Sequence, residues 1–98
     1  MMIFDEKDFG KPLDERLSIT LRRNTSKDDY ANVAGRTSIS FSTIRDVIYR
    51  TNSLTKANSK AIRALVRIAF DNSLAKQLQA EGDKKYLDRL LEPYSRQL

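Results

Sequence analysis

Residues 30–49 have the sequence YANVAGRTSISFSTIRDVIY, in which a short turn rich in Ser and Thr separates two segments of helical periodicity. In the first segment, Tyr30, Val33, Ala34 and Thr37 recur at the i, i+3, i+4, i+7 spacing that places side chains on one helical face. Two helices that cross closely need a small residue at the crossing, and Ala34 meets that need. The stretch therefore predicts two short helices that pack across one another.

Polar side chains mark where each of these helices should begin. Ser26 followed three residues later by Asp29 resembles a capping box, so the first helix is expected over residues 27–36. Ser40 is a good N-cap for a second helix over residues 41–50.

The second helix has an apolar side and a polar side. Ile44, Val47 and Ile48 fall on the side that should be buried. The outward side largely holds polar and aromatic residues, namely Phe41, Ser42, Arg45, Asp46 and Tyr49. This division predicts a helix that packs with one face and offers the other to a partner.

The preceding segment is expected to form a helix over residues 12–23. Leu13, Leu17 and Leu21 recur every four residues, and Pro12 would occupy the first helical position, which tolerates proline. A strand is the alternative, because apolar residues also alternate over residues 17–21.

The following segments complete an all-α, five-helix bundle. Thr55 is expected to cap a broadly apolar helix over residues 56–70. After a restart at residues 71–73, a short helix should run to residue 80, and Gly82 should separate it from an amphipathic segment. The apolar residues of that last segment are Tyr86, Leu87, Leu90 and Leu91, and they end before Pro93.

The length of 98 residues fits one small domain with a single core. We divide it into an N-terminal arm over residues 1–12, a core over 13–70 and a C-terminal helical extension over 71–98. Phe4 and Phe9 of the arm are expected to pack against the body.

The net charge of +5 is concentrated in the middle of the chain. Residues 1–37 and residues 71–98 each carry equal numbers of basic and acidic side chains. Residues 38–70 carry six basic side chains, Arg45, Arg50, Lys56, Lys60, Arg63 and Arg67, against the single acid Asp46. Because this basic region begins inside the quoted stretch, a polyanionic partner is favoured over a merely solvated basic face. Arg63 and Arg67 are instead expected to pair with acidic residues of the tail.

The composition argues against several function classes. The sequence has no Cys and no His, which removes thiolate metal sites, Cys nucleophiles and the commonest general base. We therefore expect no enzyme, no catalytic residue, no metal, no cofactor and no small-molecule ligand. No apolar run approaches the ~20 residues that cross a bilayer, and the acidic N-terminus is unlike a signal peptide. A cytoplasmic protein is expected.

The spacing within the quoted stretch resembles the helix-turn-helix of lambda-repressor-like (Cro/repressor-type) DNA-binding domains. Ala34 is followed four residues later by Ser38 at the tight turn and then by Ile39 as an apolar plug, with Ile44 and Val47 five and eight residues past that plug. The resemblance covers residues 13–70. The family usually has Gly at the turn, where this sequence has Ser38; because a positive φ is strained for a residue other than Gly, the turn geometry is expected to differ slightly.

The resemblance implies which residues meet DNA. Six positions would face base edges: Ser40, Phe41, Ser42, Arg45, Asp46 and Tyr49. The start of the fourth helix, near Lys56 and Lys60, would lie against a phosphate backbone.

The side-chain chemistry gives these positions expected roles. Arg45 is the strong candidate for guanine, while Ser42 and Thr43 suit bases or phosphates. Phe41 suits a thymine methyl group, and Asp46 either accepts from cytosine or orients Arg45 or Arg50. Phosphates are the expected partners of Arg50, Lys56, Lys60 and Arg23, and the Tyr49 hydroxyl could also donate to one.

These features predict a sequence-specific double-stranded DNA-binding protein, a small transcriptional regulator of the repressor kind that reads the major groove with helix 41–50. The alternative is a helical adaptor or inhibitor that binds an acidic protein. The C-terminal helix either caps the bundle within one chain or pairs with its copy, and a homodimer is favoured because one recognition helix covers only a half-site.

Overall fold

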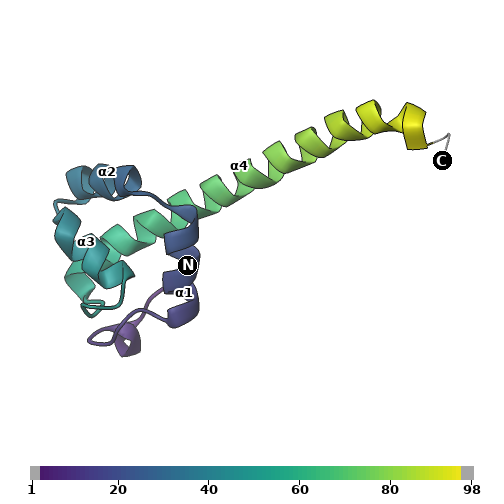
Figure 1. Ribbon diagram of the computed structural model, residues 1–98. Coiled ribbons are helices and arrows are strands. Elements are labelled where there is room, and N and C mark those ends of the chain that lie inside the picture. The colour runs from purple at the N-terminus through teal and green to yellow at the C-terminus, as the bar shows by residue number, and fades with distance from the viewer. Residues whose placement is uncertain (1–2, 96–98) are drawn as a thin grey trace.

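The computed structural model describes residues 3–95, which are helical or irregular and contain no strand (Figure 1). A 3₁₀ turn, η1 (Glu6–Asp8), precedes four α-helices in that range. These are α1 (Glu15–Asn24), α2 (Lys27–Thr37), α3 (Phe41–Ile48) and α4 (Lys56–Ser95). The all-α class is therefore confirmed, but the expected count of five helices is wrong.

The first leucine-rich segment forms helix α1, which confirms the predicted helix and excludes the alternative strand. It begins at Glu15, because the Asp14 carboxylate accepts a hydrogen bond from the Leu17 N–H at 3.1 Å and caps the helix there. The expectation that Pro12 is the first helical residue is wrong, since Pro12 and Leu13 precede this cap.

The start of α2 confirms the predicted capping box. Ser26 Oγ accepts from the Asp29 N–H at 3.4 Å, and the Asp29 carboxylate accepts from the Ser26 N–H at 2.9 Å.

The turn after α2 contains a serine in the left-handed conformation. Ser38 has φ 59° and ψ 19°, and its N–H donates to the Ala34 carbonyl at 3.0 Å. This geometry satisfies an otherwise unpaired carbonyl at the helix end, in the way that a C-terminal glycine usually does. Ser38 thus takes the backbone conformation that the turn requires, although this conformation is strained for a residue with a Cβ atom.

Ser40 caps α3 as predicted, since its Oγ accepts from the Thr43 N–H at 3.1 Å. The helix ends at Ile48 rather than at residue 50, and this shortening is a correction. Arg50 has φ 63°, and the Asp46 carbonyl accepts from the N–H groups of Thr51 and Asn52, so the chain closes back on the last turn.

The largest difference from expectation is that α4 is continuous through residues 71–73 and through Gly82. The expected restart and break are wrong. The Asn72 side-chain amide donates a hydrogen bond to the Asn24 carbonyl at 2.9 Å and does not cap a new helix. One glycine costs an interior helical position only about 1 kcal/mol, which good helix formers on either side offset.

The core gathers buried side chains from all four α-helices. The fully buried set includes Leu21, Val33, Ile44, Val47, Ile48, Leu54, Ile62 and Leu65. Phe4 is also buried and Phe9 packs partly against the core, which confirms that the arm lies on the body.

Helix α4 projects far beyond this core, so the molecule measures 62 × 26 × 26 Å (Figure 1). Every residue from 73 to 92 is exposed. The alternative in which the C-terminal helix caps the helical body within one chain is therefore wrong.

Candidate nucleic-acid interface

The inner face of α3 fixes the helix against the body. Ile44, Val47 and Ile48 are completely buried. At the C-terminal end, the buried Ser18 hydroxyl of α1 donates to the Ile48 carbonyl. These contacts hold one side of α3 and leave the other side at the surface.

The N-terminus of α3 presents a group of hydroxyls. Ser40 Oγ lies 2.8 Å from Thr43 Oγ1 and 3.3 Å from Ser42 Oγ. Hydroxyls beside the free N–H groups of a helix N-terminus can donate to an anion such as a phosphate. Of the three residues, Ser40 and Ser42 are exposed and Thr43 is half-buried.

Arg45 and Asp46 form an ion pair on the outward side of α3. Arg45 Nε donates to Asp46 Oδ1 at 3.1 Å, and Arg45 Nη2 lies 3.1 Å from the same oxygen. Both side chains remain about half exposed, so the pair is weakly bound and can open. The geometry matches the predicted role of Asp46 in orienting Arg45.

A hollow of about 310 Å³ adjoins this ion pair. Four predicted residues line it, Phe41, Arg45, Asp46 and Tyr49, together with Lys27, Tyr30 and Thr51. Phe41 is half-buried and its ring packs at a tilt on Tyr30, with centroids 6.0 Å apart. Phe41 is thus partly committed to the body, whereas Tyr49 is 50% exposed.

Two basic residues near α3 were missed in the sequence. The Arg22 guanidinium lies 5.2 Å from the centroid of the Tyr49 ring, a cation–π contact, and Lys27 lines the hollow from the first position of α2. Both belong to residues 1–37, whose net charge is zero, so the charge distribution along the sequence did not indicate a basic surface there. Local pattern gave no signal for either, because α1 and α2 meet α3 only through the fold.

Arg50 is turned away from the hollow. Its Nε donates to the Leu13 carbonyl at 2.7 Å, which ties the end of α3 to the loop before α1. This contact gives Arg50 a structural role beside the phosphate contact predicted for it.

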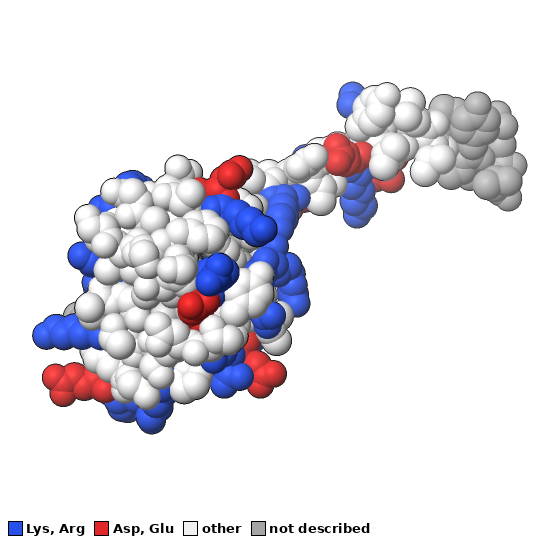
Figure 2. Space-filling view, turned by 60° about the vertical axis from the view of Figure 1, so that its left-hand side comes forward, with Lys and Arg blue, Asp and Glu red and all other residues white. Residues whose placement is uncertain are grey.

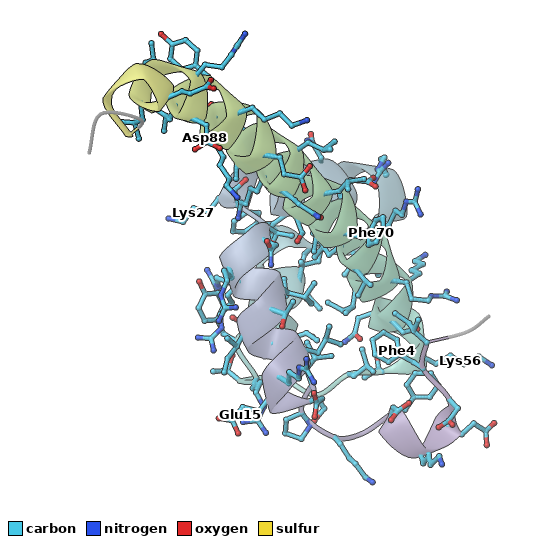
Figure 3. All side chains as sticks on the ribbon, turned by 90° about the vertical axis from the view of Figure 1, so that its right-hand side faces the viewer. Phe4, Glu15, Lys27, Lys56, Phe70 and Asp88 are labelled. Carbon is cyan, nitrogen blue, oxygen red and sulfur yellow. The ribbon has the colours of Figure 1, made fainter. Side chains whose placement is uncertain are left out.

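Lys56 and Lys60 lie in a different place from the α3 hollow. They line a second hollow of about 770 Å³ at the start of α4, with Ser59, Arg63 and four residues of the arm, Phe4, Asp5, Glu6 and Phe9. Figure 3 shows Phe4 beside Lys56 at this end of α4. The fold therefore brings an acidic arm to the lysines that were predicted to meet phosphate.

The two arginines expected to pair with the tail behave differently. Arg67 lies 3.6 Å from Asp71 on the next turn of α4, which agrees with that expectation. Arg63 instead lines the hollow beside the arm, as do Asp5 and Glu6.

On the face shown in Figure 2, basic side chains lie mainly around the edge of the body, and one acidic group lies beside a basic one near the middle. The basic groups therefore surround a largely uncharged surface. Among residues 3–95, no group of three or more acidic side chains is placed to hold a metal ion. The described helices also include none that is apolar over the length a membrane requires.

Comparisons of the chain with protein-family models, with curated protein sequences and with solved structures give no match.

Proposed function

We propose that this protein binds duplex DNA in a sequence-specific manner, as a small transcriptional regulator of the repressor kind, by placing α3 in the major groove. One observation carries the proposal: α2 and α3 are joined by a three-residue turn with a left-handed Ser38, and α3 buries one face completely while exposing the other. A helix held in this way on a helical partner is the element that helix-turn-helix proteins insert into the groove.

The exposed chemistry of α3 supports this use. Arg45 can exchange its Asp46 partner for the O6 and N7 atoms of guanine, and the hydroxyls of Ser40, Ser42 and Thr43 can fix the helix N-terminus on the backbone. Lys27 and Arg22 add positive charge beside the hollow. The proposed DNA surface thus centres on α3, and the exposed Lys56 and Lys60 supply further positive charge at the start of α4.

Fluorescence anisotropy on random duplex and on DNA from the protein's own promoter region, across a salt series, tests the proposal. Affinity should fall steeply with salt, and a promoter preference should survive at higher salt. Arg45→Ala should weaken binding to the preferred site by ~1–3 kcal/mol and leave random DNA less affected.

Arg16→Ala is the matched control, because Arg16 does not line the hollow beside α3 and lies instead in a separate hollow with Ser73 of α4. Equal loss on preferred and random DNA would reassign Arg45 to a phosphate. Absence of binding at low salt would contradict the proposal.

A helical adaptor or inhibitor that binds an acidic protein is the second candidate. The exposed apolar side chains of α4, including Phe70, Leu78 and Leu87, favour it. Removal of residues 83–98 would then abolish partner binding and leave any DNA affinity of the body unchanged.

A further inference from the structure

The projecting half of α4 carries an uninterrupted row of residues four positions apart. The row consists of Phe70, Leu74, Leu78, Gly82, Tyr86 and Leu90, and we call it the apolar ridge. All six residues are exposed, and Phe70, Leu78 and Tyr86 each expose more than half of their surface, at 59%, 59% and 56%. Residues four apart form a continuous ridge on an α-helix, and this one is about 30 Å long.

Figure 3 shows that the labelled Phe70 lies beside the body and Asp88 far along the projecting helix. Lys76 ties the helix to the body, since its Nζ donates to the Arg23 carbonyl at 3.1 Å and to Asn24 Oδ1 at 3.3 Å. Most of the ridge therefore extends past the point at which α4 is anchored.

Gly82 lies in the middle of the ridge, and no close contact within the chain requires a glycine there. A Cβ built on it would meet nothing within 4 Å, and it lies in an uninterrupted helix with no positive φ. Glycine weakens a helix relative to alanine, and packing of another helix against this position would offset that cost. A bare backbone position lets another helix approach closely.

We propose that a second copy of this chain packs antiparallel across α4, with the two helices crossing at Gly82. The ridge is symmetric about that glycine, since Leu78 and Tyr86 flank it on one turn and Leu74 and Leu90 on the next. A two-fold contact requires such a self-complementary surface. Ridges of this spacing interdigitate in the commonest class of helix crossing.

Charge on the projecting helix also fits a second copy. Residues 73–92 hold four basic side chains, Lys76, Lys84, Lys85 and Arg89, and four acidic ones, Glu81, Asp83, Asp88 and Glu92, so two copies do not repel each other. Glu81 and Lys85 share the row beside the ridge. In an antiparallel crossing this row lies along the same row of the second copy, and each Glu81 meets the Lys85 of the other chain.

This dimer rests on the proposed function, which explains why two copies would associate. The dimer itself can be tested without DNA. Sedimentation velocity of the full chain over a concentration series should show a monomer–dimer equilibrium. Leu78→Glu should weaken the dimer at least about tenfold, because a charge would be buried at the crossing. In dilute solution, where both proteins are monomers, its melting temperature should equal that of the parent, since Leu78 is exposed in the monomer.

Charge variants identify the orientation. Lys85→Glu should weaken association about fivefold, as expected for two like-charge contacts at a partly exposed interface. Lys84→Glu, with the same change in charge on the far side of α4 from Gly82, should have no effect. Glu81→Lys combined with Lys85→Glu should restore association.

A monomer at all concentrations, an equal effect of Lys84→Glu, or a double variant that fails to recover would overturn the crossing. DNA binding measured on the same variants separates the two proposals. If Leu78→Glu and the parent protein are both monomers that bind DNA, only the crossing fails. If the parent dimerises as described and binds no DNA, only the proposed function fails.

Discussion

The two halves of α4 carry similar side chains in opposite surroundings. In the N-terminal half, Ala61, Ile62 and Leu65 are completely buried by α1, α2 and α3. In the C-terminal half, Leu78, Leu87 and Leu90 each expose more than half of their surface. The apolar side chains of the first half are buried within the body, whereas those of the second half are exposed. An identical substitution should therefore have different consequences in the two halves.

Leucine truncation is the strongest way to test this contrast. Leu65→Ala should lower the free energy of unfolding by about 2–5 kcal/mol, because it leaves a cavity in a closed core. Leu87→Ala should lower it by less than about 0.5 kcal/mol in dilute solution, since Leu87 is half exposed. Urea denaturation followed by circular dichroism measures both. Similar losses for the two variants would show that the projecting half is packed in solution.

The contact that ties α1 to the end of α3 should give the next largest effect. Ser18→Ala leaves the buried Ile48 carbonyl without its hydroxyl donor, so stability should fall by about 1–3 kcal/mol. Thr20→Ala is the control, since its exposed hydroxyl bonds only to the Arg16 carbonyl of its own helix. The same urea titration separates them, and an unchanged midpoint for Ser18→Ala would show that this contact does not fix α3.

The turn between α2 and α3 should respond in the opposite direction. Ser38→Gly should raise stability by about 0.5–1 kcal/mol, because glycine accepts a φ of 59° without steric cost, although its unfolded chain is more flexible. Ser42→Gly within α3 should lower stability, since no positive φ is needed there. Thermal denaturation would reveal the two signs. Destabilisation by Ser38→Gly would mean that the serine side chain contributes more than its backbone conformation costs.

The features predicted from sequence are those encoded within a few residues. The Ser26 capping box and the Ser40 cap depend on neighbours along the chain, and the buried trio of α3 follows from helical periodicity. These local signals do not depend on how the rest of the chain folds, so they can be recognised in the sequence.

The features that sequence missed depend on distant residues or on small energy differences. Ser18 contacts Ile48 and Arg50 contacts Leu13 across separations of 30 and 37 residues, which no local pattern encodes. The arm reaches Lys56 and Lys60 only in the folded chain. The continuity of α4 could not be predicted by treating Gly82 as a helix break. A glycine costs an interior helical position about 1 kcal/mol, which weakens a long helix without ending it.

The smallest expected effect belongs to Gly82→Ala, and it tests the two halves of α4 most directly. Alanine should favour the local helix by up to about 1 kcal/mol, which should raise helical circular dichroism slightly at low concentration. The midpoint of body unfolding should not move, because residues 77–92 are exposed and can fray without opening the core. A rise in that midpoint would instead show that both halves of α4 unfold as one unit. At high concentration the added methyl group lies at the proposed crossing, so the same variant should gain helix as a monomer and yet associate more weakly.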